Sequence, residues 1–321
     1  MKDSWRPTAN FAALRRRAEM LTAAREFFAG QGVLEVETPI LSAAAVTDPQ
    51  IESLTTRVAG MAAPRFLCTS PEFAMKRLLA AGSGDIYQIC KVFRDGERGR
   101  WHNPEFTLIE WYRLGFDDAA LMSELEALAG RMLAPHRQLQ PAERLSYSAA
   151  MLRYAGVDVH AAGDADLYES VLRHGIDCPK ALDRDATLDL LMGFVVGPRL
   201  GLERPCFICD YPVSQAALAR LKPGPPPVAA RFELYLDGIE LANGFHELAD
   251  GGEQRARFTR DLRLRHARGA AAPPLDEHLL EAMVAGMPDC AGVALGFDRL
   301  VAVALGAPRL ADAMAFTIDN A

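Results

Sequence analysis

Two arginines far apart in the sequence stand where they could bind phosphate groups. Arg94 begins a charged stretch that runs to residue 103, and Arg299 lies just after Gly296, where a short apolar strand is expected to pass into a helix. The first turn of a helix presents free backbone amides and the positive end of the helix dipole, so an arginine there adds to a site that favours anions. We therefore interpret Arg94 and Arg299 as candidate ligands of a polyphosphate.

The charged stretch is followed by a segment that indicates a hairpin. A strand expected over 105–113 places Phe106, Leu108, Glu110 and Tyr112 on one face, because successive side chains of a strand point to opposite sides. An apolar face that ends in a carboxylate and a phenol is unusual for a protein core. The charged loop before this strand either clamps a polyanion or is merely solvated, and this segment alone leaves both interpretations open.

A pair of carboxylates lies near the other end of the chain. Glu240 and Glu247 flank Asn243-Gly244, a dipeptide that is typical of a tight turn. If the chain bends there, both carboxylates converge on a metal ion or an ammonium group, since carboxylates that share a site need a cation. The sequence has no glycine-rich phosphate loop that ends in Gly-Lys-Ser/Thr. Arginines for phosphates, acidic residues for Mg²⁺ and Phe106 for a flat base therefore predict an ATP site of another kind.

These residues need a scaffold, and the hydrophobic pattern indicates strands in series with helices interposed irregularly. Asn10 is expected to cap a helix that extends to Phe28, with apolar residues at helical spacing, and a strand follows over 33–38. This irregular order indicates an α+β fold with an antiparallel sheet. The stretch 135–203 is mostly helical by pattern and is expected to be an insertion that covers the sheet. Further expected strands are 65–68, 86–90, 206–211, 232–237, 239–243 and 292–295, and further helices are 71–81, 117–133, 184–196, 253–268, 276–285 and 297–305.

Composition limits the classes of function. The chain has 321 residues, 50% of them hydrophobic, and a formal charge of −7, so its overall field does not attract nucleic acid. The run Arg15-Arg16-Arg17 is expected to be a solvated helix face rather than a basic patch. No apolar run approaches the ~20 residues of a membrane span, and the N-terminus lacks a signal-peptide core. We expect a cytoplasmic protein with a single domain over 1–321.

Five segments, in their order and spacing, resemble a class II aminoacyl-tRNA synthetase core of the lysyl type. Residues 32–39 resemble motif 1, residues 93–112 resemble motif 2, and residues 296–299 resemble motif 3. Residues 69–72 and 240–247 resemble the amino-acid and metal segments of lysyl-tRNA synthetases. This resemblance implies the class II fold, which is an antiparallel sheet flanked by helices, and a homodimer built on motif 1.

The closer resemblance is to the elongation factor P–lysine ligases, a family of paralogues of the lysyl-tRNA synthetase catalytic domain, and it covers nearly the whole chain. Only about 30 residues precede motif 1, whereas an anticodon-binding domain needs roughly a hundred. Residues 214–218 read Ser-Gln-Ala-Ala-Leu where lysyl-tRNA synthetases usually have Ser-Pro-Leu, and Ala294 stands where they usually have glycine. We therefore expect no anticodon-binding domain and no tRNA substrate.

The resemblance implies a role for each matching residue. Arg94 would hold the α-phosphate and the substrate carboxylate, Arg299 the γ-phosphate, and Phe106 would stack on adenine. The usual Arg-x-Glu of motif 2 is Arg94-Asp-Gly96 here, with the acid displaced to Glu97. The implied ATP-binding residues are Arg94, Asp95, Gly96, Asn103, Phe106, Glu240, Leu241, Gly296 and Arg299; Glu240 and Glu247 would hold Mg²⁺; and Ser70, Pro71, Glu72, Tyr112, Glu247 and Ala294 would surround the amino acid.

The implied reaction has two steps. ATP and (R)-β-lysine, or lysine, form an aminoacyl-adenylate and pyrophosphate, and the acyl group then passes to a lysine ε-amine on elongation factor P. Positioning and charge neutralisation on the phosphates would supply the catalysis, with no enzyme nucleophile. Three alternatives remain: a lysyl-type synthetase that charges tRNA without an anticodon domain, a non-catalytic regulatory paralogue, and an amide-forming synthetase of the asparagine type on the same fold.

Overall fold

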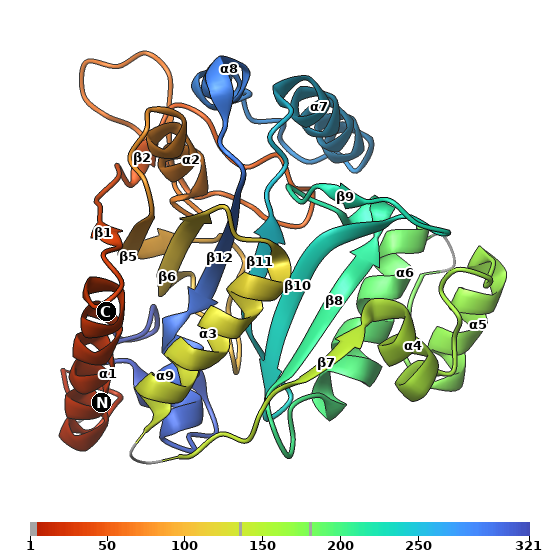
Figure 1. Ribbon diagram of the computed structural model, residues 1–321, viewed down its shortest axis with the longest axis horizontal. Coiled ribbons are helices and arrows are strands. Elements are labelled where there is room, and N and C mark those ends of the chain that lie inside the picture. Colours follow the sequence, from red (N-terminus) through yellow and green to blue (C-terminus); the bar gives the residue numbers. More distant parts are fainter. Residues whose placement is uncertain (1–4, 135–136, 180–181) are drawn as a thin grey trace.

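A long mixed sheet crosses the middle of the molecule in the computed structural model, which describes residues 5–134, 137–179 and 182–321 (Figure 1). Its strands are β1 (Leu34–Glu35), β5 (Ile86–Phe93), β6 (Glu105–Leu114), β7 (Glu143–Ser146), β8 (Cys206–Pro212), β9 (Leu221–Lys222), β10 (Val228–Leu236), β11 (Ile239–His246) and β12 (Cys290–Gly296). The spatial order is β1-β5-β6-β12-β11-β10-β8-β7, and β9 pairs with β10. Pairing is antiparallel except at the two edges, where β1 with β5 and β7 with β8 run parallel. The predicted α+β fold on a largely antiparallel sheet is confirmed.

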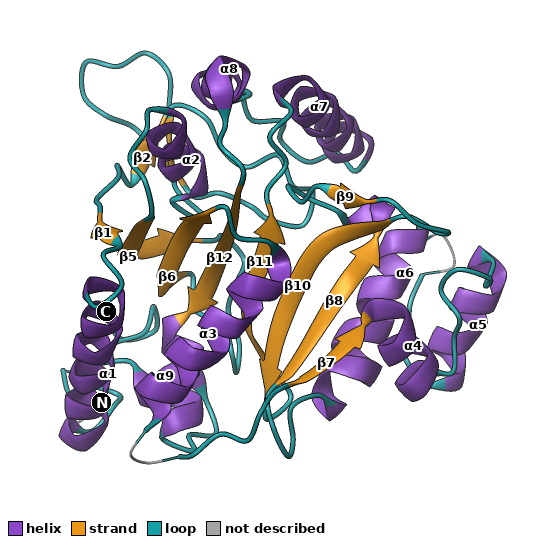
Figure 2. Ribbon diagram, in the orientation of Figure 1, coloured by secondary structure: helices purple, strands orange, loops and turns teal. Residues whose placement is uncertain are grey.

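A second, smaller sheet lies above the β5–β6 end of the main sheet in Figure 2. It consists of β2 (Leu41–Ser42), β3 (Thr55–Thr56) and β4 (Arg65–Leu67), in the order β2-β4-β3. The strand expected over 33–38 is therefore much shorter than predicted, since only Leu34 and Glu35 pair with β5 before Pro39 removes a backbone donor.

Helices cover the faces and the upper end of the main sheet. In Figure 1, α3 lies in front of the strands, α9 lies below β12, α2, α7 and α8 lie along the top, and α4, α5 and α6 gather beyond β7 and β8. Their bounds are α1 (Phe11–Ala29), α2 (Glu72–Ala80), α3 (Asp118–Leu133), α4 (Tyr147–Ala155), α5 (Asp164–Arg173), α6 (Arg184–Leu191), α7 (Gly251–Ala267), α8 (Glu277–Gly286) and α9 (Phe297–Ala304). A π-helical turn, Met192–Val196, continues α6, so the helix expected over 184–196 changes its winding midway.

The first helix begins as predicted, but its buried face differs from the expectation. Asn10 caps α1, accepting a hydrogen bond from the Ala13 amide at 2.8 Å. The expected solvated face over 15–17 is wrong for two of its three arginines. Arg16 is buried and donates to the backbone oxygens of Met132, Leu133 and Ala134 at the end of α3, while Arg17 pairs with Asp298 of α9. Both arginines therefore join helices.

The turn between β10 and β11 falls at Asp237-Gly238, not at Asn243-Gly244. Both turn residues have positive φ, 54° and 73°, the backbone that a two-residue hairpin of the primed type requires. Asn243 and Gly244 instead pair within the strand, with Glu233 and Phe232. As a result β11 continues as one strand from Ile239 to His246, with an irregularity in its pairing to β10 next to Leu234 and Tyr235.

Strand β6 divides the molecule into a core side and a cavity side. Ile109 and Trp111 are fully buried in the apolar cluster that also contains α1, α3 and α9. The alternate side chains from Phe106 to Tyr112 face the opposite side, where they line a cavity. The predicted one-face arrangement of these residues is confirmed.

The segment expected to be a helical insertion contributes an edge strand as well as helices. Its expected start at 135 lies outside the described residues. From Glu143 the chain forms β7, and then α4, α5 and α6, which pack with β8 and β10 around a second apolar cluster. The segment thus extends the sheet at one edge and covers that extension.

Candidate active site

One cavity of about 610 Å³ opens on the face of the sheet opposite to α1 and α3. Strands β6, β11 and β12, helices α2 and α7 and the loop 42–48 contribute to its walls. Asp95 and Gly96 lie outside the lining, whereas all the other expected site residues contribute to it. Those residues are Ser70, Pro71, Glu72, Arg94, Asn103, Phe106, Tyr112, Glu240, Leu241, Glu247, Ala294, Gly296 and Arg299.

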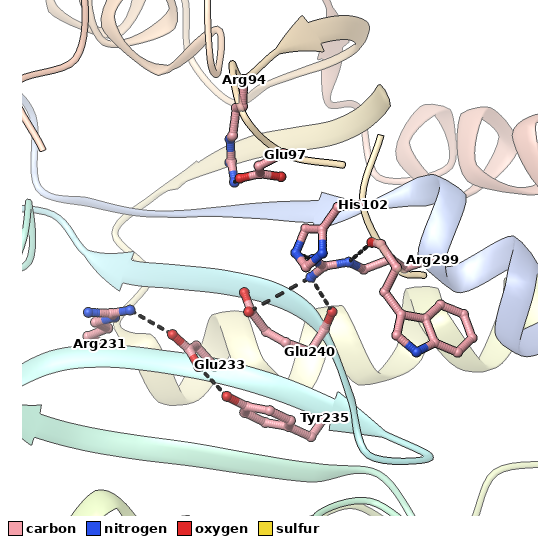
Figure 3. Close-up of polar contacts among 9 residues, drawn as sticks. Arg94, Glu97, His102, Arg231, Glu233, Tyr235, Glu240 and Arg299 are labelled. Atoms are coloured by element: carbon pink, nitrogen blue, oxygen red, sulfur yellow. Dashed lines mark hydrogen bonds and ion pairs between the residues drawn. The ribbon is translucent and has the colours of Figure 1, made fainter. Parts of the chain in front are cut away.

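Arg94 lies over the ring that is expected to stack on a base. Its guanidinium carbon is 5.0 Å from the ring centre of Phe106, and its Nη1 is 3.4 Å from Glu97 Oε1. The acid displaced from the usual motif 2 position thus faces the arginine (Figure 3). Asn103 is nearly buried, and both ends of its amide are used: Nδ2 donates to Glu105 O and Oδ1 accepts from the Ile318 amide. Asn103 therefore braces this loop.

Arg299 is fixed by backbone oxygens from two segments. It donates to Glu240 O at 2.9 Å and to Trp101 O at 3.2 Å, and its Nη2 lies 2.8 Å from Nε2 of His102 (Figure 3). Burial and the charge of Arg299 lower the pKa of His102, so the neutral imidazole accepts from the guanidinium. This bracing holds a positive charge at one end of the cavity.

The expected convergence of Glu240 and Glu247 on one metal ion is wrong. Because Asn243 and Gly244 continue β11 instead of turning, Glu240 lies near the start of this strand and Glu247 directly after its end, roughly 20 Å apart at about 3.3 Å per residue. Glu240 instead lies near Glu233 of β10, and burial together with the charge of Glu233 raises the pKa of Glu240. Glu233 also accepts hydrogen bonds from Arg231 at 2.6 Å and from the Tyr235 hydroxyl at 2.7 Å (Figure 3).

The carboxylates of Glu240 and Glu233 suit a hard cation whose remaining ligands come from a bound nucleotide and from water. Mg²⁺ prefers oxygen ligands and is usually held by one or two carboxylates plus phosphates and water. Within the described residues, no group of three or more His, Cys, Asp or Glu side chains could hold a metal ion. Glu240 and Glu233 therefore fit a nucleotide-bound Mg²⁺ rather than a permanent protein cage.

A different set of carboxylates occupies the other end of the cavity. Glu110 is fully enclosed and accepts hydrogen bonds from Ser70 Oγ at 2.7 Å and from the Tyr112 hydroxyl at 2.8 Å. Burial and the nearby charge of Glu72 raise the pKa of Glu110 to about 7. Gly292 leaves the space that this arrangement needs, since a Cβ there would overlap the Tyr112 ring and an oxygen of Glu247.

Glu72 and Glu247 share one ammonium group. Lys76, with 0% of its side chain exposed, places Nζ 2.7 Å from Glu72 Oε1 and 2.6 Å from Glu247 Oε2. Burial raises the pKa of Glu247 to about 8 despite the opposing charge of Lys76. Burial lowers the pKa of Lys76, but the two carboxylates outweigh it and the net shift is upward. Three carboxylates, with Glu110, and one ammonium leave two negative charges when all are ionised, and such a site attracts a ligand with two ammonium groups.

We predict that affinity for a diammonium amino acid rises with pH. Glu110 and Glu247 have folded-state pKa values of about 7 and about 8, above their ordinary value, so the ligand-free protein keeps both protons at pH 6, and by pH 8 Glu110 has lost most of its proton and Glu247 about half. The cation binds the ionised forms, so its Kd should fall by at least about tenfold between pH 6 and pH 8 with release of protons. The same raised pKa values make the ligand-free protein less stable as pH rises through this range. Calorimetry in two buffers of different ionisation enthalpy measures both effects, and a Kd independent of pH would contradict the assignment.

Several residues of the site were not predicted, and some left a signal in the sequence. The alternation of side chains along β6 places the carboxylate of Glu110 on a largely apolar strand face, and this was the signal for that residue. Lys76 stands four residues after Glu72 on an expected helix, the spacing of a helical ion pair. Glu233 lies two residues from Arg231 on one strand face, the spacing at which the two side chains meet. His102 left no signal beyond its place in a charged loop.

Comparison with known proteins agrees with this geometry. Residues 3–320 match the family described as tRNA synthetases class II (D, K and N). The chain is 49% identical over 324 residues to the elongation factor P--(R)-beta-lysine ligase of Salmonella arizonae, an alignment that covers 99% of this chain and 98% of that protein. Proteins of the same name from Salmonella typhi and Salmonella paratyphi A are each 48% identical over the same shares.

Proposed function

The chain belongs to the class II tRNA synthetase family of the D, K and N type, and we propose that it is an ATP-dependent ligase that joins (R)-β-lysine to elongation factor P. The observation that carries this proposal is the two-ended cavity. One end presents Arg94 and Arg299 to phosphates, and the other has two negative charges in excess when its three carboxylates are ionised, which suits an amino acid with two ammonium groups. The name shared by the similar proteins identifies that amino acid and its acceptor.

The two ends order the substrates along the sheet. Adenine would stack on Phe106, the γ-phosphate would reach Arg299, and Arg94 would lie where the α-phosphate meets the amino-acid carboxylate. Glu240 and Glu233 would hold Mg²⁺, which offsets phosphate charge and helps pyrophosphate to leave. Glu110, Glu72 and Glu247 would receive the ammonium groups. The side chains thus position both reactants for in-line attack.

In the first step, an oxygen of the amino-acid carboxylate attacks the α-phosphorus of ATP. The bond from that phosphorus to the oxygen bridging to the β-phosphate breaks, and pyrophosphate leaves with the electron pair. In the second step, a lysine ε-amine of elongation factor P attacks the carbonyl carbon of the adenylate. AMP leaves, the nitrogen gives up a proton to solvent, and an amide remains. Arg94 offsets the charge that builds on the phosphate in each step.

ATP–pyrophosphate exchange with each lysine isomer tests the proposed activation step. We expect exchange with (R)-β-lysine and weaker exchange with α-lysine. Absence of exchange with every lysine isomer in a folded preparation would contradict the proposal and favour a regulatory paralogue. We propose that tRNA is not a substrate, and charging of total tRNA with lysine would favour the rival synthetase.

Replacement of Ala294 by glycine should shift the choice between lysine isomers. Ala294 lies on β12 between Glu110 and Asn243 of the flanking strands and lines the cavity, so its methyl group occupies space next to the amino acid. The methyl crowds an α-amino group but leaves room for an amine one carbon further along the chain. A difference of one methyl group in the shape of a pocket changes the ratio of kcat/KM values for two substrates by about 10- to 200-fold. We expect kcat/KM for α-lysine relative to β-lysine to rise by at least about tenfold.

The added glycine costs about 0.5–1 kcal/mol of backbone entropy, so the variant should still fold. An unchanged ratio of kcat/KM values in the folded variant would mean that Ala294 only packs against its neighbours.

We propose that the enzyme is a homodimer that pairs through α1 and β1. Each of the two elements carries an exposed apolar side chain: Phe11 at the start of α1 is 72% exposed, and Leu34 of β1 is 55% exposed. Large apolar side chains that a dimer would cover are consistent with an interface on these elements. Sedimentation at micromolar concentration should give a dimer, and Leu34→Glu should weaken it; a wild-type monomer at that concentration would contradict the proposal.

The proposed location follows from the protein substrate. Elongation factor P serves translation, so we place the enzyme in the cytoplasm. Among the described residues, no helix combines the length and the apolar character that crossing a membrane requires.

A further inference from the structure

A glutamine without any hydrogen-bond partner lines the same cavity. Gln254 of α7 is 1% exposed, and among the described residues neither its Oε1 nor its Nε2 has a partner. Buried amides in folded proteins are nearly always hydrogen-bonded, because leaving both groups unpaired is unfavourable. The side chain also contributes to the cavity wall. The amide is therefore available to a ligand in the cavity.

The neighbours of Gln254 on α7 show which end of the cavity it reaches. Three residues on, Arg257 donates to the backbone oxygens of Ala217 and Ala219, and Ala219 forms a β-bridge with Glu247. Four residues on, Phe258 packs in the apolar cluster that includes Tyr112. Residues three and four apart share a helix face, so the amide lies on the side of α7 that faces Glu247 and Tyr112.

A second unpartnered polar atom lies at this end of the cavity. Oε1 of Glu247 is buried and has no hydrogen-bond partner among the described residues, since Lys76 approaches the other oxygen, Oε2. An ammonium group has three donors and no acceptor, so one such group can donate to both a carboxylate oxygen and an amide oxygen. A hydroxyl or a methyl in the same place could not satisfy both acceptors.

We propose that Gln254 is a specificity-determining residue whose Oε1 accepts a hydrogen bond from the side-chain ammonium of the amino-acid substrate, together with Oε1 of Glu247. The inference rests on the proposed function and deepens it, because it assigns a neutral partner to a group otherwise bound by carboxylates. A site built to hydrogen-bond a substrate group rejects analogues that lack the group, since its own polar atoms then remain unpaired. Gln254 thus selects an amine at the end of the substrate chain.

The test compares Gln254→Met and Gln254→Glu with the wild type in ATP–pyrophosphate exchange. Methionine keeps the length of the side chain and removes the amide, whereas glutamate keeps an acceptor oxygen. The substrates are (R)-β-lysine and 3-aminohexanoic acid, which has the same backbone amine and no terminal ammonium. Gln215→Leu is the matched control, because that amide is already bound to Asp189 and does not line the cavity.

For Gln254→Met we expect KM for (R)-β-lysine to rise by about tenfold with kcat within twofold, and no change in the residual activity with 3-aminohexanoic acid. Gln254→Glu should restore most of the selectivity, and Gln215→Leu should leave it unchanged. The Tm of ligand-free Gln254→Met should be equal to that of the wild type or a few degrees higher, because the substitution removes an unpaired buried amide.

Three results would overturn the inference: an unchanged KM for (R)-β-lysine in Gln254→Met, an equal loss with both substrates, or failure of both Gln254 variants to fold. The last two would mean that the amide supports the structure rather than the substrate. Wild-type exchange with (R)-β-lysine, measured in the same series, tests the proposed function separately.

Discussion

Replacement of Arg299 by alanine is expected to lower the rate of ATP–pyrophosphate exchange by about 10²–10³. Backbone oxygens of Glu240 and Trp101 hold the guanidinium at the end of the cavity that we propose for the phosphates, so its charge is already in place when the reaction begins. Negative charge increases on the leaving pyrophosphate in the transition state. The arginine therefore stabilises the transition state more than bound ATP, and kcat should fall along with kcat/KM.

Arg309→Ala is the matched control for this experiment. Arg309 is exposed, pairs with Asp312 three residues away and does not line the cavity. We expect its exchange rate to stay within about twofold of wild type, as for most surface changes away from a site. Exchange by Arg299→Ala within threefold of wild type would show that the phosphate assignment is wrong.

Replacement of Lys76 by methionine is expected to lower the free energy of unfolding by about 3–5 kcal/mol at pH 8. Lys76 is fully buried, and its removal leaves Glu72 and Glu247 facing each other without their shared cation. The loss should be smaller at pH 5. Glu247 has a raised pKa of about 8, so below that pH it binds a proton, becomes neutral and no longer needs the ammonium. Urea unfolding at the two pH values measures the difference.

Lys91→Met provides the comparison with a lysine outside the cavity. Lys91 is partly exposed, and its Nζ lies 3.6 Å from Glu105, so removal of this surface pair should cost less than about 1 kcal/mol at either pH. A loss in Lys76→Met that is equally large at pH 5 and pH 8 would contradict the role of the ammonium as the cation that offsets Glu247.

The parts of the fold that depend on local pattern could be predicted from the sequence. The alternation of β6 places Phe106, Glu110 and Tyr112 on one face whatever lies around the strand, and the structure shows them on the cavity wall. The cap at Asn10 is equally local. The two arginines at one end of the cavity could also be predicted, because Arg94 and Arg299 lie in segments whose spacing resembles a known family.

Features that depend on long-range packing could not be predicted in this way. Two Xaa-Gly turn signals compete in the hairpin of β10 and β11, and the Asp237-Gly238 signal forms the turn. The choice sets the register, and it placed Glu240 and Glu247 at opposite ends of a strand. The sequence of its own helix predicts Arg16 to be exposed. Its burial is favourable only because α3 packs against it and supplies carbonyl oxygens as hydrogen-bond acceptors.

The most direct test of the account is the mass of elongation factor P after incubation with this enzyme, ATP, Mg²⁺ and (R)-β-lysine. We predict that the factor gains the mass of one lysyl residue, carried on a lysine side chain, and that the gain requires ATP and is abolished by Arg299→Ala. An unchanged mass under conditions in which the same preparation catalyses ATP–pyrophosphate exchange with (R)-β-lysine would contradict transfer to this protein.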